Sequence, residues 1–143
     1  MPYTLTPAAN TMAIAEREYG TAANQIQFTA FTSCIGVAVR IGNDVRGVHL
    51  TISGADGTTL FSPDIVPDVM AVLENNYTEA FIIGQIQYWE AQENGVSLAY
   101  ADLVTAVSAV VVGGAVGANF TTYPLADGTY GAEVLGGHFS PTY

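Results

Sequence analysis

Two runs of alternating side chains flank the turn sequence Gly42-Asn43-Asp44 and constrain the fold more than any other part of the chain. Residues 35–41 and 46–53 each place large aliphatic side chains on one face and small or polar side chains on the other. Alternation with a period of two is typical of β-strands, and glycine, asparagine and aspartate favour tight turns. The two runs therefore predict a β-hairpin.

This hairpin region contains the only cysteine of the chain, Cys34, and one of its two histidines, His49. Both lie on the faces with small and polar residues, so both are expected on the same side of the sheet. A two-residue loop at 43–44 would pair Ala38 with His49 and leave Cys34 four residues away, roughly 13 Å along the strand. A Cys–His hydrogen bond requires about 3 Å. A catalytic pair therefore requires a bend at residues 32–36, a bulge, or strands that are not direct neighbours.

A purely structural interpretation of these two residues is also available. Cysteine is among the most frequently buried residues, and a single histidine in a strand is commonly structural. The rest of the chain offers no other chemistry: His138 is far from His49, and the glycine-rich residues 113–117 follow an expected helix instead of beginning one. We expect no metal and no cofactor.

The remaining sequence predicts helices and further strands around the hairpin. Helices are expected over 8–19, from Ser62 onward and over 98–113, and strands over 25–31, 80–88, 116–123 and 130–135, with a hairpin turn at 126–128 and an irregular tail from 136 to 143. This order predicts a single α+β domain over residues 1–143. Its sheets are expected to be mainly antiparallel or mixed and sandwich-like, with two or three helices packed against them.

The charge balance excludes several classes of partner. Acidic residues outnumber basic ones 13 to 3, there is no lysine, and the formal net charge is −10. Such a chain cannot neutralise a phosphate backbone, so a nucleic-acid partner is not expected. The uncharged run 103–118 is shorter than the roughly 20 apolar residues that span a bilayer. The N-terminal residues lack the pattern of a Sec signal peptide, so we expect a cytoplasmic protein or an effector delivered into a host cell.

The sequence TSC at residues 32–34, followed by an apolar strand and then VHLTIS at 48–53, resembles the Cys–His glutamine deamidases of the CheD and cytotoxic necrotizing factor type. These families end a small-residue turn, of the form GSC or SGC, with the nucleophilic cysteine. The toxin branch separates cysteine and histidine by 15 positions, as here, where 49 − 34 = 15. The resemblance covers residues 29–53. Thr32 replaces the glycine of the first form, and Ser33 that of the second.

The resemblance implies a thiol amidohydrolase that converts a protein glutamine to glutamate through a thioester, or transglutaminates when an amine replaces water. Cys34 would be the nucleophile and His49 the base that takes the thiol proton. Backbone N–H groups of Ser33, Cys34 and Ile35 would form an oxyanion hole. The implied partner is a protein substrate bearing a reactive glutamine.

The resemblance leaves the group that orients the imidazole undecided. CheD-like proteins carry a threonine six residues before the cysteine, and here that position is Phe28, with Thr29 beside it. Thr29, Thr32 or a backbone carbonyl would serve.

Two alternatives come from other functional classes. A non-catalytic structural or assembly subunit of an envelope or virion fits a chain that is half apolar and only 11% charged. A small-molecule-binding domain could retain the fold without the chemistry. The oligomeric state is not predicted.

Overall fold

The computed structural model describes residues 3–93, 95–111 and 119–143. Six strands form one sheet in the order β1-β2-β5-β4-β6-β7, and three form a second sheet in the order β3-β8-β9. The strands are β1 (Thr6–Pro7), β2 (Glu18–Ala23), β3 (Gln25–Gln27), β4 (Ile35–Ile41), β5 (Asp44–Leu50), β6 (Glu79–Gly84), β7 (Phe120–Pro124), β8 (Gly131–Leu135) and β9 (His138–Thr142). The predicted α+β class, with mixed and antiparallel sheets, is confirmed.

The helices are the 3-10 turn η1 (Pro63–Ile65), α1 (Val66–Leu73), α2 (Ile86–Glu90) and α3 (Val96–Val110). The helix expected from Ser62 onward corresponds to η1 and α1, where prolines occupy the first turns. Helix α3 matches the apolar helix expected over 98–113, of which residues 112 and 113 lie outside the described ranges. No helix within those ranges is long and apolar enough to cross a membrane.

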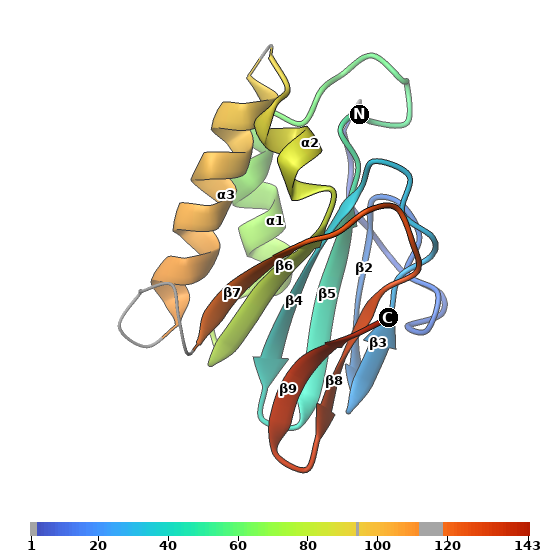
Figure 1. Cartoon of the computed structure of the whole chain (residues 1–143), viewed down its shortest axis with the longest axis vertical. Coiled ribbons are helices and arrows are strands. Elements are labelled where there is room, and N and C mark those ends of the chain that lie inside the picture. Colours follow the sequence, from blue (N-terminus) through green and yellow to red (C-terminus); the bar gives the residue numbers. More distant parts are fainter. Residues whose placement is uncertain (1–2, 94, 112–118) are drawn as a thin grey trace.

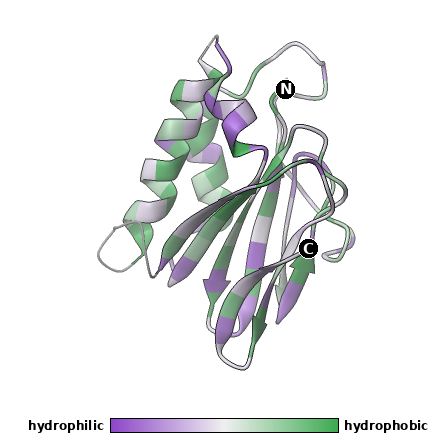
Figure 2. Ribbon diagram, viewed as in Figure 1, coloured by the Kyte–Doolittle hydropathy of each residue, from purple (hydrophilic) through white to green (hydrophobic). Residues whose placement is uncertain are grey.

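The elements form three layers (Figure 1). The helices cover one face of the six-stranded sheet, and the three-stranded sheet lies against the opposite face. Two apolar cores result. The first core includes Ile35, Val37 and Leu50 and lies between the helices and the large sheet, whereas the second includes Cys34 and Ala38 and lies between the two sheets. Figure 2 shows the corresponding alternation of hydrophobic and hydrophilic residues along the strands.

The face with small residues is therefore also buried. Ring atoms of Phe28 would lie only 2.7 Å from a β-carbon added to Gly36 and 3.0 Å from one added to Gly47. Because both positions lack side chains, the aromatic ring packs directly on strands β4 and β5. The pattern of small residues thus serves close packing between the two sheets.

The hairpin β4–β5 forms as predicted, but its register differs by two residues. The loop is Gly42-Asn43, which pairs Ile41 with Asp44 and Gly36 with His49. Gly42 has a φ of +63°, and a type II′ hairpin turn gives this first loop position to glycine. The predicted pairing of Ala38 with His49 is wrong. The observed register brings Cys34 to within two residues of the position opposite His49, instead of four.

Three expectations near the chain ends are wrong. Residues 8–19 form no helix: their backbone is bonded to distant segments, with Ile14 N–H donating to Gln27 O and Arg17 N–H donating to His49 O. The tail expected to be irregular forms β9, which pairs with β8 around Gly136 and Gly137 at φ of +59° and +79°. The turn at 126–128 joins no hairpin, because β7 pairs with β6 and β8 with β9 and β3.

Two strands are shorter than expected. The strand predicted over 80–88 ends at Gly84, which has a φ of +123°, and the chain turns there into α2. The strand predicted over 25–31 ends at Gln27, with one further bridge between Phe28 and Ile14. The residues that follow both strand ends lie near the beginning of β4: Gln85 N–H donates to the Cys34 carbonyl, and residues 28–34 lead directly into β4.

Candidate active site

Cys34 lies at the end of a tight turn, one residue before β4 begins. The turn is fixed on both sides of Ser33: its N–H donates to Asp127 Oδ1 at 2.9 Å, and its carbonyl accepts from Trp89 Nε1 at 2.9 Å. Ser33 has a φ of +62°, which residues other than glycine rarely adopt. Ser33 thus occupies the conformation suited to glycine, as expected if it replaces the glycine of an SGC turn.

We expect Ser33→Gly to stabilise the protein. Glycine adopts a positive φ without steric cost, and relief of the left-handed conformation is worth about 1 kcal/mol after the entropy of the unfolded chain is counted. The Ser33 hydroxyl makes no hydrogen bond within the described ranges, so its loss costs little. Urea unfolding should show a higher midpoint for Ser33→Gly. Ser33→Ala is the control, and an equal gain in that variant would contradict the explanation.

His49 is fully buried on β5, beneath the ring of Phe31 at a centroid distance of 4.7 Å. Its Nδ1 lies 2.9 Å from the carbonyl oxygen of Ile14 and 3.5 Å from Thr29 Oγ1. A carbonyl oxygen can only accept, so Nδ1 carries the proton and Nε2 presents a lone pair. Nε2 has no hydrogen-bond partner among the described residues. The imidazole is therefore held as a neutral base with one free, buried nitrogen.

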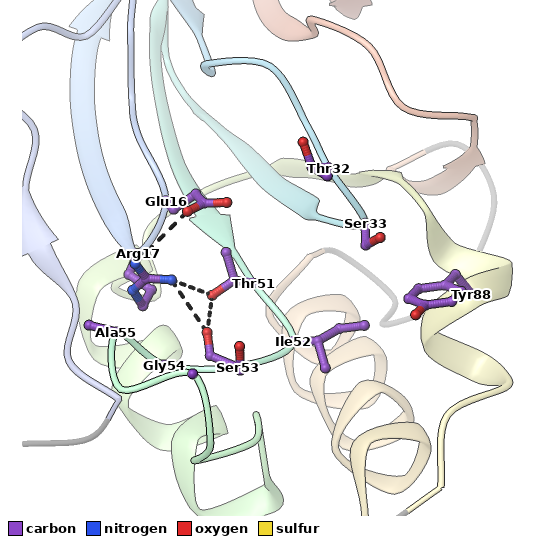
Figure 3. Close-up of a pocket in the computed structure, with 11 residues that line it drawn as sticks. Glu16, Arg17, Thr32, Ser33, Thr51, Ile52, Ser53, Gly54, Ala55 and Tyr88 are labelled. Carbon is purple, nitrogen blue, oxygen red and sulfur yellow. Dashed lines mark hydrogen bonds and ion pairs between the residues drawn. The ribbon is translucent and has the colours of Figure 1, made fainter.

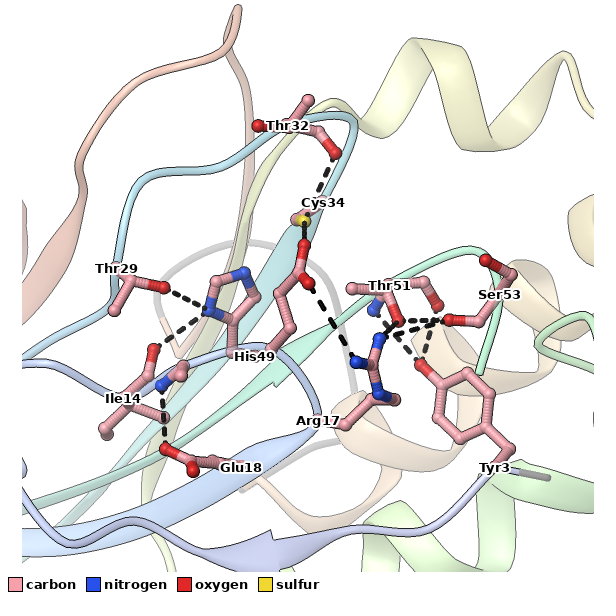
Figure 4. Close-up of polar contacts among 12 residues, drawn as sticks. Tyr3, Ile14, Arg17, Glu18, Thr29, Thr32, Cys34, His49, Thr51 and Ser53 are labelled. Atoms are coloured by element: carbon pink, nitrogen blue, oxygen red, sulfur yellow. Dashed lines mark hydrogen bonds and ion pairs between the residues drawn. The ribbon is translucent and has the colours of Figure 1, made fainter. Parts of the chain in front are cut away.

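Cys34 and His49 lie on the same face of adjacent strands (Figure 4). Diagonal neighbours of this kind have β-carbons roughly 7 Å apart, within the reach of an imidazole. The thiol does not bond to the ring in this conformation. Its sulfur instead lies 3.4 Å from the carbonyl oxygen of Thr32 and 3.7 Å from Glu16 Oε2. A Cys–His hydrogen bond requires the Cys34 side chain to leave the Thr32 and Glu16 oxygens and turn toward the ring.

Burial keeps both groups in their neutral forms. Desolvation raises the pKa of Cys34 to about 11, and the nearby Glu16 carboxylate adds to this increase. Desolvation lowers the pKa of His49, while the hydrogen bond to the Ile14 carbonyl acts in the opposite direction. The resting pair is thus a thiol and a neutral imidazole, not a thiolate–imidazolium ion pair.

A polar pocket of about 370 Å³ lies beside the turn that ends at Cys34, because Thr32 and Ser33 of this turn line it (Figure 3). Its lining includes hydroxyl groups, an ion pair and one aromatic ring, from Glu16, Arg17, Thr32, Ser33, Thr51, Ser53 and Tyr88. Glu16 and Thr32, the two residues that contact the Cys34 sulfur, both line this pocket. Cys34 itself is 1% exposed. The thiol is therefore separated from the pocket by the Glu16 side chain, which is 47% exposed, and by the Thr32 backbone.

The three groups that could orient the His49 imidazole differ in their contacts with the ring. The Ile14 carbonyl is the nearer partner of the imidazole, Thr29 is a longer second contact, and Thr32 makes no hydrogen bond to His49 within the described ranges.

Of the three N–H groups expected to form an oxyanion hole, that of Ser33 is occupied by Asp127. Ile35 begins β4 and pairs with Leu50 of β5 on one side and with Gly84 of β6 on the other. The Cys34 N–H has no acceptor among the described residues and is the one available donor.

Sequence patterns did not indicate four of the groups that shape this site. Ile14 and Glu16 lie in the segment expected to be helical, whereas Trp89 and Asp127 belong to elements far along the chain. No motif links these positions, because only the packing of the two sheets and α2 brings them together. No cluster of histidine, cysteine and carboxylate side chains in the described ranges could hold a metal ion.

Comparison of the chain with protein-family models, with curated proteins and with solved structures finds no match.

Proposed function

We propose that this protein is a Cys–His glutamine deamidase acting on protein substrates. The observation that carries the proposal is the free Nε2 of His49, buried on the same face of the sheet as the only thiol of the chain. A buried nitrogen without a partner costs free energy, because its hydration is lost without compensation. Such a group is therefore expected mainly where function requires it. A base that takes the proton from a thiol on the same face of the sheet supplies such a requirement.

The reaction uses this pair in two steps. His49 Nε2 takes the thiol proton, and the Cys34 sulfur attacks the carboxamide carbon of a substrate glutamine. The C–N bond then breaks, the leaving nitrogen takes the proton from His49, and ammonia departs from a thioester. A water molecule, deprotonated by His49, hydrolyses the thioester to glutamate and restores the thiol. The Cys34 N–H stabilises the oxyanion in both steps.

Alkylation of Cys34 by iodoacetamide tests the pair directly. At neutral pH we expect the parent to react roughly fivefold or more faster than His49→Gln, which keeps the side-chain volume but lacks the base. Because the pKa of Cys34 is about 11, both rates should increase with pH as the thiolate fraction rises. His138→Gln, on an exposed histidine, is the control. Equal rates in the parent and His49→Gln would remove the basis of the proposal.

The same variants extend the test to the reaction. Unfolded casein serves as a probe rich in glutamine, and mass spectrometry reports conversion of its glutamines to glutamate. Conversion should occur with the parent and disappear in both Cys34→Ser and His49→Gln.

A second candidate is a non-catalytic assembly subunit. It is favoured by the burial of Cys34 among the apolar residues of the second core, where a structural cysteine would lie. This function predicts a large particle in size-exclusion chromatography and alkylation that is slow and independent of His49. The deamidase proposal makes the opposite prediction for alkylation.

A further inference from the structure

We infer that Glu16 is a specificity-determining residue that admits neutral carboxamides to Cys34 and rejects carboxylates. The inference rests on the proposed function and adds a role for a residue outside the Cys–His pair. Three observations support it: Glu16 Oε2 lies 3.7 Å from the Cys34 sulfur, the Glu16 side chain is 47% exposed, and it lines the polar pocket.

The position of Glu16 makes its charge part of the environment of the reacting atoms. A group that approaches the sulfur from the pocket meets this carboxylate, because Glu16 both contacts the sulfur and lines the pocket. When the thiol rotates toward His49, the Glu16 oxygen loses its donor. It is then free to accept a hydrogen bond from a ligand.

Carboxamides and carboxylates differ in the property that this oxygen detects. The side-chain amide of glutamine carries two N–H donors, whereas an ionised carboxylate carries only acceptors. Glu16 can therefore accept a hydrogen bond from the substrate amide but repels the glutamate that deamidation produces. The repulsion between two carboxylates a few ångströms apart lowers the binding affinity of a carboxylate ligand several-fold, even when water screens the charges. The same residue would select the substrate and assist release of the product.

The neighbouring charges modify this effect without replacing it. Arg17 lies 3.9 Å from the other oxygen of Glu16, and its guanidinium also donates to Thr51 Oγ1 at 2.9 Å and to the Ser53 carbonyl (Figure 3). These bonds hold Arg17 near Glu16 Oε1, whereas the sulfur contacts Oε2. Asp127 contributes a second negative charge near Cys34, which acts in the same direction as Glu16.

Iodoacetamide and iodoacetate test the inference with reagents that differ as substrate and product do. Both alkylate the thiolate and lose iodide, but one carries a carboxamide and the other a carboxylate. We expect Glu16→Gln to raise the ratio of the iodoacetate rate to the iodoacetamide rate by roughly five- to tenfold. The ratio cancels any change in the thiolate fraction, and glutamine keeps the volume of the side chain. Glu90→Gln makes the same change of charge at an exposed site at the end of α2 and should leave the ratio unaltered.

The outcomes separate the two proposals. Alkylation that depends on His49, together with an unchanged ratio in Glu16→Gln, overturns the role of Glu16 and leaves the deamidase proposal intact. A rise in the ratio in Glu16→Gln alone supports the inference. Failure of both reagents to modify Cys34, in the parent and in Glu16→Ala, overturns both proposals, because removal of the covering side chain would then not expose a functional thiol.

Discussion

Gly84→Ala should lower the free energy of unfolding by about 3 kcal/mol. Gly84 ends β6 with a φ of +123°, which strains any residue with a β-carbon. An added β-carbon would also lie 2.6 Å from the carbonyl oxygen of Cys34 and 2.9 Å from the ring of Phe31. The Cys34 carbonyl accepts from Gln85 N–H at 3.0 Å, so the backbone there cannot move without breaking this bond.

Gly57→Ala separates the cost of the positive φ from the cost of the close contact. Gly57 also has a positive φ, of +73°, but an added β-carbon would have no neighbour within 4 Å. Its expected cost is therefore the conformational part alone, about 1 kcal/mol. Urea unfolding of both variants measures the difference. Equal losses in the two variants would show that the contact with the Cys34 carbonyl contributes nothing.

Acidification should destabilise the native state through His49. Its pKa in the native protein is below the value of 6.5 expected in the unfolded chain, because burial disfavours the charged ring. Below pH 6.5 the unfolded chain therefore binds a proton that the native state does not, and stability decreases as the pH falls. The loss begins as the pH falls through about 6.5 and ends once the native state also binds a proton at His49.

Comparison with His49→Gln isolates this contribution from the titration of carboxylates. As the pH falls below 6.5, the free energy of unfolding of the parent should decrease more than that of His49→Gln. His138→Gln, which removes an exposed imidazole at the start of β9, is the control for the loss of a histidine. A parent and a His49→Gln variant with parallel stability curves would mean that His49 is protonated in the native state, and Nε2 would then not be a free base.

Local patterns were sufficient for part of the site. The alternation in residues 35–41 and 46–53 predicted the hairpin and the common face of Cys34 and His49, because a strand places every second side chain on the same side. The register was not predictable from the same residues. Gly42, Asn43 and Asp44 all favour turns, and only the conformation of Gly42 at φ +63° selects the loop that brings Cys34 two residues closer to His49.

The segment before β2 illustrates the opposite case. The apolar spacing in residues 8–19 favours a helix, but the N–H of Ile14 bonds to Gln27 and that of Arg17 to His49. Local propensity contributes a few tenths of a kcal/mol per residue, which a few long-range backbone bonds and a buried side chain outweigh. Ile14 is fully buried and Glu16 reaches Cys34 for this reason.

Patterns of near neighbours along the chain thus determined the fold class, the hairpin and the identity of the two candidate site residues, Cys34 and His49. The packing of distant segments alone decided the tautomer of His49, set by the Ile14 carbonyl, and the covering of Cys34 by Glu16. Repetitive strands encode their faces in the local alternation of residues. Irregular segments satisfy their backbone groups with partners far away in the sequence, so their positions follow only from the complete tertiary structure.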